Sequence, residues 1–97
     1  MSKPGYAYIM TNKNHSVLYT GVTSDLETRL IQHKSGYFSN SFTARYNVEI
    51  LVYFEKSASI EDAIAREKQI KAGSRQKKNE LISRLNSEWK DLSGISF

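Results

Sequence analysis

Hydrophobic and polar residues alternate in two short runs near the start of the chain. Both runs are rich in β-branched and aromatic residues, which favour strands: YAYIMT at residues 6–11 and SVLYTGV at residues 16–22. The segment between them, NKNH, consists of turn-forming residues, so we expect an antiparallel hairpin. A loop of these four residues places Tyr8 directly opposite Tyr19, with both phenol rings on one face of the sheet.

The apolar spacing then changes to a helical period. Ser24 and Glu27 form a capping box, which predicts a helix that begins there and ends at about Lys34. The next apolar run, VEILVYFE at residues 48–55, is almost unbroken and is typical of a strand covered on both faces. The segment before it, YFSNSFTARYN at residues 37–47, is polar apart from its aromatic residues, and we expect a loop.

The last part of the chain predicts two more helices. Ser59, with Asp62 three residues later, opens the first of them, and Gly73 marks its end. Ser74 caps the second, whose apolar residues recur every four positions on one face: Leu81, Leu85 and Trp89. The order strand, strand, helix, strand, helix, helix predicts an α/β (α+β) fold. We expect a small three-stranded antiparallel or mixed sheet flanked by three helices.

Composition narrows the class of protein. A length of 97 residues with 39% hydrophobic residues fits one domain, with a core at about residues 5–86 and a C-terminal segment at 87–97. The absence of cysteine excludes a disulfide scaffold, a thiolate nucleophile and a cysteine-ligated zinc site. No apolar run is long enough for a signal peptide or a membrane span, so we expect a soluble cytoplasmic protein.

Positive charge is concentrated in one part of the chain. The net charge is only +4, but residues 66–78 include six basic side chains and a single acidic one, Glu67. The six are Arg66, Lys68, Lys71, Arg75, Lys77 and Lys78. Such a stretch suits a polyanionic partner such as nucleic acid. A well-solvated helix surface would carry the same charges, and charge alone favours neither interpretation.

The first predicted helix carries polar side chains on its apolar stripe. With about 100° per residue, His33 falls on the same side of the helix as Leu26 and Leu30, and Arg29 lies at one edge of this stripe. A single histidine there is typical of the edge of a core, and an arginine can extend to solvent. The pair, one turn apart, favours a lined cleft.

The second predicted helix has a carboxylate in the same kind of position. Glu67 lies in the middle of an apolar arc formed by Ile60, Ala63, Ile64 and Ile70. Turning a carboxylate toward a core is costly unless a positive group meets it. A local pair with Lys71 contributes only a few tenths of a kcal/mol if it is exposed. A divalent cation, or an arginine across a cleft, explains this placement better.

Two tyrosines, an arginine, a histidine and a carboxylate together suit phosphodiester hydrolysis. An arginine can clamp the phosphoryl oxygens on which negative charge develops, and a base must take a proton from water. Mg²⁺ is commonly held by only one or two carboxylates, with waters and substrate phosphates completing its shell. A tyrosine with its ordinary pKa near 10 is a poor base, so nearby positive charge would have to lower that pKa.

These residues, in this order, resemble the GIY-YIG nuclease superfamily, and in particular its small stand-alone bacterial members. YAYIM stands where the family has its GIY segment and YTG where it has YIG, although Tyr6, Ala7 and Thr20 replace the usual glycine and isoleucines. TSDLETRLIQH resembles the helix with the family arginine and histidine, and AIAREKQIK resembles the segment with its glutamate. FTARYNVEILVYFE and NSEWKDL resemble later signatures.

The resemblance implies a three-stranded antiparallel sheet and a role for each matching residue. Tyr8 and Tyr19 would lie at the scissile phosphate, with Tyr19 favoured as the general base or the group that orients water. Arg29 would stabilise the transition state, and His33 would assist proton transfer or contact phosphate. Glu67 would bind Mg²⁺ or Mn²⁺. The family also has a late asparagine, for which Asn86 is the candidate and Asn79 the alternative.

The resemblance also implies a nucleic-acid partner. Phosphate contacts from the basic helices would supply affinity without sequence choice: Lys68, Lys71, Arg75, Lys77 and Lys78. The aromatic residues of the predicted loop would either stack on unpaired bases or cover the core: Tyr37, Phe38, Phe42 and Tyr46.

Three functions follow, of which a divalent-metal-dependent DNA endonuclease is the first. The second is a weakly active or inactive nucleic-acid-binding module that acts within a DNA repair or processing complex. The third is a helix-turn-helix binder, because IKAGSRQKKNELI joins two helices through a short glycine turn. That third interpretation leaves Glu67, Arg29 and the tyrosine pair unexplained.

Overall fold

A three-stranded antiparallel sheet forms the centre of the computed structural model, which describes residues 3–35, 42–95 and 97. The strands are β1 (Gly5–Thr11), β2 (Leu18–Thr23) and β3 (Ile50–Ser57), in the spatial order β2-β1-β3. β1 pairs antiparallel with both neighbours, so the purely antiparallel form of the predicted sheet is confirmed. β3 begins and ends two residues later than predicted.

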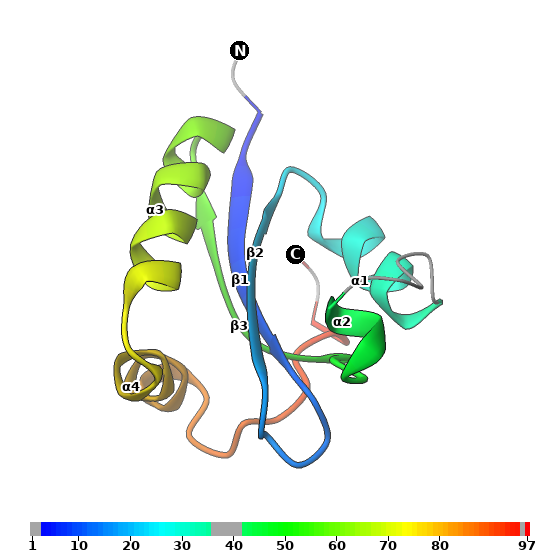
Figure 1. Cartoon of the computed structure of the whole chain (residues 1–97). Helices are drawn as coiled ribbons and strands as arrows, with labels where there is room; N and C mark the ends of the chain where they lie inside the picture. The colour runs from blue at the N-terminus through cyan, green and yellow to red at the C-terminus, as the bar shows by residue number, and fades with distance from the viewer. Residues whose placement is uncertain (1–2, 36–41, 96) are drawn as a thin grey trace.

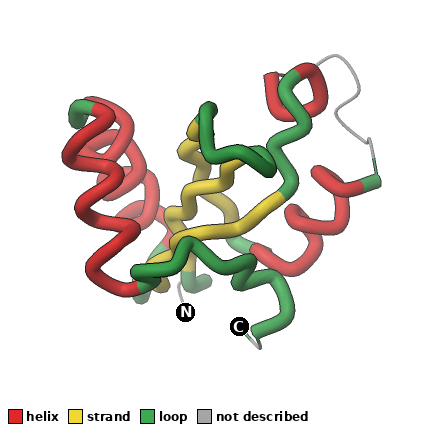
Figure 2. Tube along the Cα trace, turned by 90° about the horizontal axis from the view of Figure 1, so that it is seen from below, coloured by secondary structure: helices red, strands yellow, loops and turns green. Residues whose placement is uncertain are grey.

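Helices lie on both faces of this sheet. α1 (Leu26–Lys34) and α2 (Phe42–Arg45) lie on one side, and α3 (Ile60–Ala72) and α4 (Arg75–Leu85) lie on the other (Figures 1 and 2). The short α2 falls in the segment predicted as a loop. Within the described residues, none of these helices is long and apolar enough to cross a membrane.

The central strand explains why the protein has two cores. All seven residues of β1 are buried, because each face of the strand is covered. Alternate residues of β1 therefore join different clusters. The cluster on the α1 side contains Tyr6, Tyr8, Met10, Leu26, Leu30, Val48 and Leu51. The cluster on the α3 side contains Ala7, Ile9, Val52, Tyr53, Ile70 and Ile82.

The hairpin register differs from the predicted one. Met10, not Tyr8, lies opposite Tyr19, and residues 12–17 form a six-residue loop instead of a four-residue one. The loop is longer because the side chain of Asn12 accepts hydrogen bonds from the backbone N–H groups of Ser16 and Val17, at 2.9 and 3.1 Å. A shift of two residues preserves the face of each side chain, so both tyrosines remain on the α1 side.

Helix caps were predicted correctly for the last two helices but not for α1. Ser59 and Ser74 cap α3 and α4, each accepting from the backbone N–H three residues later. The N-cap of α1 is Asp25, not Ser24, and its carboxylate accepts from the N–H of Thr28 at 3.2 Å. The cap moves by one residue because the hydroxyl of Thr23 accepts from the Asp25 N–H and extends the turn after β2.

The predicted apolar face of the last helix was also wrong. α4 ends at Leu85, whose side chain is 72% exposed, and Trp89 lies beyond the helix with a positive φ of 55°. The Trp89 ring instead packs on His15 of the hairpin loop, with 5.0 Å between ring centroids. Asn86 is the C-cap of α4, and its backbone N–H donates to the carbonyl of Ile82.

Asn86 fastens the C-terminal segment to β3. Its amide nitrogen donates to the carbonyls of Val52 and Lys90 at 3.0 and 2.9 Å, and its amide oxygen accepts from the Lys90 N–H at 3.0 Å. The side chain is buried, so its loss would leave backbone groups without partners.

We therefore predict that Asn86→Ala lowers the free energy of unfolding by about 2–3 kcal/mol, because three hydrogen bonds are lost and the Val52 carbonyl stays buried. Urea denaturation followed by circular dichroism measures this loss. Asn79→Ala is the matched control, because the Asn79 side chain is engaged by exposed Arg75 on the surface of α4, and its effect should stay within about 0.5 kcal/mol. Equal losses in both variants would contradict the role of Asn86.

Candidate active site

The Tyr8 phenol lies directly over Gly21 of the neighbouring strand. The two residues face each other across the β1–β2 ladder. A Cβ added to Gly21 would lie 2.5 Å from both the phenol oxygen and Cζ of Tyr8, closer than atoms can approach. Glycine is therefore required at this position of the YTG motif. Because β2 is an edge strand, the ring carries its hydroxyl from the central strand to the sheet edge.

α1 places His33 against this phenol. The Tyr8 oxygen is 3.3 Å from His33 Nε2, and His33 Nδ1 is 3.1 Å from the hydroxyl oxygen of Thr43 on α2. The Tyr19 ring lies beside both, with centroids 6.3 Å from Tyr8 and 5.7 Å from His33. Tyr8 is fully buried and Tyr19 only half-buried, so Tyr19 is the more accessible phenol. The predicted grouping of the two tyrosines with His33 therefore exists in the structure.

Electrostatics link Arg29 and Glu67 to the same phenol. Burial raises the pKa of Tyr8 far above its ordinary value of 10, and the neighbouring Tyr19 phenol adds to this rise. The guanidinium of Arg29 opposes it through its charge and a hydrogen bond to the phenol, and the carboxylate of Glu67 raises the pKa slightly. Both side chains thus lie within electrostatic reach of Tyr8, which stays protonated at neutral pH.

Burial and the charge of Arg29 also favour the neutral form of His33. Burial lowers its pKa below 6.5, and the positive charge of Arg29 lowers it further. A neutral imidazole has one donor and one acceptor nitrogen, which matches its position between two hydroxyl groups.

Glu67 reaches the site from the other side of the sheet. α1 and α3 lie on opposite faces of the sheet (Figure 1). α3 contacts both β1 and the edge strand β2, and Glu67 is half-buried on this helix. Among the described residues, no three histidine, aspartate or glutamate side chains form a metal-binding group. A single carboxylate nevertheless fits Mg²⁺ that takes its other ligands from water and phosphate.

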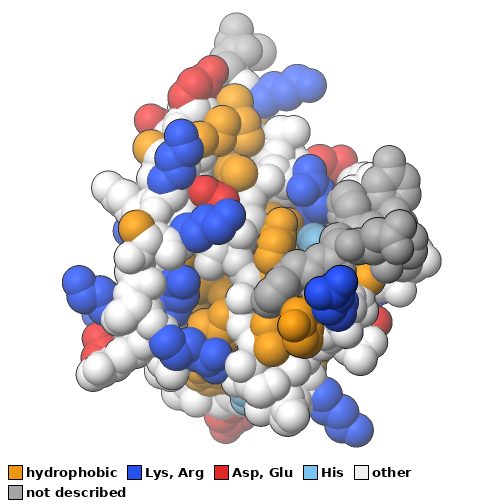
Figure 3. Space-filling model, in the orientation of Figure 1, with side chains coloured by type: hydrophobic (Ala, Val, Ile, Leu, Met, Phe, Trp, Pro, Cys, Tyr) orange, Lys and Arg blue, Asp and Glu red, His pale blue; other side chains and the backbone are white. Residues whose placement is uncertain are grey.

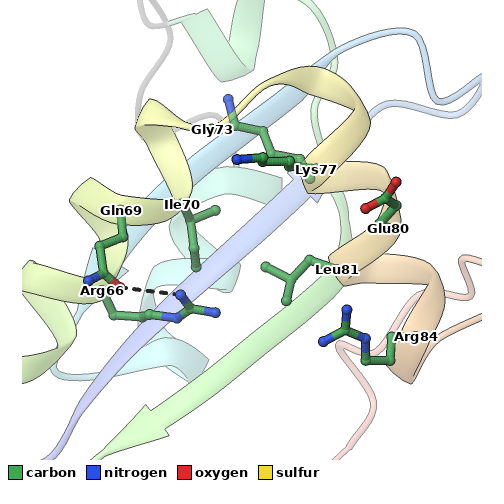
Figure 4. Close-up of a pocket in the computed structure, with 9 residues that line it drawn as sticks. Arg66, Gln69, Ile70, Gly73, Lys77, Glu80, Leu81 and Arg84 are labelled. Carbon is green, nitrogen blue, oxygen red and sulfur yellow. Dashed lines mark hydrogen bonds between the residues drawn. The ribbon is translucent and has the colours of Figure 1, made fainter.

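The predicted basic residues divide between two surfaces. Lys68 and Lys71 are exposed and, by helical spacing, lie on the flank of α3 next to Glu67. Lys77 and Lys78 instead line a groove of about 330 Å³ between α3 and α4, with Ile70 and Leu81 at its base (Figure 4). Lys and Arg side chains gather over α3 on the face that includes the β2 edge (Figure 3).

Arg75 has a structural contact that the sequence did not indicate. Its guanidinium donates to the carbonyls of His15 and Ser16 at 2.6 and 3.2 Å, which fastens the hairpin loop to α4. The α3–α4 pair that suggested a helix-turn-helix buries Ile70 and Ile82 against the sheet.

Several predicted residues do not join the group around Tyr8. The Asn86 side chain is engaged by the backbone on the α3 side of the sheet, and Asn79 accepts from Arg75. Tyr46 is largely exposed. Tyr37, Phe38 and the side chain of Phe42 lie outside the described residues. Sequence reasoning missed Thr43, because nothing in a polar segment distinguishes a threonine that bonds to a distant histidine.

The contact between Gly21 and Tyr8 predicts a steric effect. Gly21→Ala should lower the free energy of unfolding by about 1–3 kcal/mol, because the added methyl group displaces the buried phenol. Gly94→Ala is the matched control, since a Cβ there meets no atom within 4 Å. Thermal and urea unfolding of both variants measure the difference, and equal stability of the two would contradict the close approach.

The lowered pKa of His33 predicts a pH effect on stability. As the pH falls below about 6.5, the unfolded chain binds more protons than the native state. The contribution of neutral His33 to the free energy of unfolding is therefore present above that pH and is lost below it. Urea unfolding between pH 7.5 and pH 5 should show a decline that is smaller in His33→Gln. The lowered pKa values of Asp25 and Asp91 act only at lower pH. An identical decline in the variant would contradict a buried neutral His33.

Comparisons with known proteins show the family to which the chain belongs. Residues 4–80 match the family model of the GIY-YIG catalytic domain. A UPF0213 protein of Staphylococcus saprophyticus is 44% identical over 78 residues, covering 80% of this chain and 93% of that protein. One of Haloquadratum walsbyi is 38% identical over 76 residues, covering 78% and 83%. The solution NMR structure of a UPF0213 protein from Bacillus halodurans superposes with a TM-score of 0.57 at 31% identity, covering 96% of this chain and 97% of that one. The chain therefore belongs to the GIY-YIG nuclease superfamily.

Proposed function

We propose that this protein is a divalent-metal-dependent endonuclease that hydrolyses phosphodiester bonds in DNA. The observation that carries the proposal is the convergence of two phenols, an imidazole and a guanidinium at the β2 edge, with Glu67 in electrostatic reach. A purely structural core would not be expected to contain this set of polar groups, because burying each of them costs desolvation energy.

The two tyrosines differ in burial, and the roles proposed for them follow from this difference. The raised pKa of Tyr8 keeps its proton on the phenol, so Tyr8 acts as a hydrogen-bond donor and not as a base. The half-buried Tyr19 is left to orient the attacking water or accept its proton. Arg29 supplies fixed positive charge for the developing phosphoryl anion.

Glu67 is the residue that would hold the divalent ion. When bound, Mg²⁺ or Mn²⁺ would neutralise charge on the scissile phosphate and the leaving oxygen. Lys68 and Lys71 lie on the same flank of α3, where they would contact the phosphates next to the cleaved bond. Contacts of this kind bind DNA with little sequence preference.

Cleavage of DNA in the presence of metal tests the proposal. Incubation with supercoiled plasmid, single-stranded and branched DNA should give cleavage with Mg²⁺ or Mn²⁺ and none with EDTA. Glu67→Gln should lower the rate about 100-fold or more, because the ligand charge is lost while side-chain size is kept. Glu61→Gln is the matched control, since Glu61 is exposed in the first turn of α3.

Two results would overturn parts of this proposal. Unchanged cleavage by Glu67→Gln would exclude the metal role of Glu67. Binding of DNA by the natural protein without cleavage under any of these conditions would instead favour a catalytically inactive nucleic-acid-binding module.

A further inference from the structure

A buried hydrogen-bonded chain connects Tyr8, His33 and Thr43. The exposed fractions of these residues are 0%, 8% and 4%, so their polar atoms are largely shielded from water and need hydrogen-bond partners within the protein. The imidazole lies between the two hydroxyls, 3.3 Å from the phenol at Nε2 and 3.1 Å from the threonine at Nδ1. Only one of these nitrogens carries a proton in a neutral imidazole.

The two hydroxyls differ in donor strength, and this difference directs the chain. A phenol is more acidic than an aliphatic hydroxyl, so the Tyr8 hydroxyl is the better donor to the imidazole and the Thr43 hydroxyl is the better acceptor. The single phenol proton is then directed to His33 Nε2, which must be the unprotonated nitrogen. His33 Nδ1 therefore carries the proton and donates to the hydroxyl of Thr43.

The backbone of Thr43 is hydrogen-bonded to a residue of the core. The Val48 N–H donates to the Thr43 carbonyl at 2.8 Å, and Val48 is fully buried in the cluster that contains Tyr8. The position of Thr43 is thus fixed to the same core as the phenol that it influences.

We propose that Thr43 is a positioning residue that selects the Nδ1-protonated form of His33 and so holds the Tyr8 phenol in its working orientation. Thr43 acts on the phenol through the imidazole, which its hydroxyl contacts at Nδ1. Its meaning for catalysis rests on the proposed nuclease function, but its effect on the imidazole does not.

Nitrogen chemical shifts of the His33 ring in ¹⁵N-labelled protein test the proposal without any substrate. The natural protein should show the Nδ1-protonated tautomer. Thr43→Val keeps the shape of the side chain but removes the acceptor, so the ring should shift toward the Nε2-protonated form. Thr43→Ser keeps the hydroxyl and should retain the original tautomer. His33→Gln identifies which ring signals belong to His33.

Thr11→Val is the control for general loss of stability. Thr11 is also fully buried, and its hydroxyl donates to the Val17 carbonyl at 2.7 Å in the hairpin. This variant should lose a comparable amount of stability and leave the His33 tautomer unchanged. An unchanged tautomer in Thr43→Val, or an equal shift in Thr11→Val, would overturn the proposal.

Cleavage kinetics extend the test to the reaction. Thr43→Val should lower kcat about 10-fold with little change in KM, because the phenol loses its orientation while the phosphate contacts remain. Thr43→Ser should restore kcat. A tautomer shift in Thr43→Val with no cleavage by the natural protein would refute the proposed function but support the positioning of the imidazole. A shift with unchanged kcat would overturn the catalytic role of Thr43.

Discussion

The rest of the site depends on the close contact between the Tyr8 phenol and Gly21. A central strand that is buried on both faces cannot normally deliver a hydroxyl to a reaction, because helices cover its side chains. Here the neighbouring residue has no side chain, so the ring extends across β2 to the edge of the sheet. The hydroxyl thereby reaches β2, an edge strand that α3 contacts from the other face of the sheet. The absence of a side chain at Gly21 is what leaves room for the ring there.

The polar groups of this site are held at a cost that the fold has to offset. Burial alone raises the pKa of Tyr8 and lowers that of His33, so the site favours neutral side chains. At Tyr8, Arg29 opposes the effect of burial, since its positive charge and its hydrogen bond lower the pKa of the phenol. The proposed division of donor and base between Tyr8 and Tyr19 rests on their difference in burial. That difference comes from position in the sheet and not from the chemistry of tyrosine itself.

Much of this arrangement could be predicted from periodicity and caps, and the failures have physical reasons. Alternation in the strands fixes which face a side chain occupies, so Tyr8 and Tyr19 were correctly grouped although the register was two residues off. Register depended on hydrogen bonds of the Asn12 side chain, which no pattern reveals. Charges on apolar stripes predicted that Arg29, His33 and Glu67 share one site, but not that α1 and α3 lie on opposite faces of the sheet. Thr43 was missed because its only signal is a contact in space.

The central claim is that Glu67 and the phenol over Gly21 belong to one site that binds a divalent ion. Paramagnetic broadening of backbone amide signals during addition of Mn²⁺ to ¹⁵N-labelled protein tests this claim most directly. The account predicts that signals of Gly21 and of the residues around Glu67 broaden first, and that Glu67→Gln abolishes this pattern. Broadening centred on Glu61 and Asp62 at the start of α3, or unchanged broadening at Gly21 in Glu67→Gln, would contradict it.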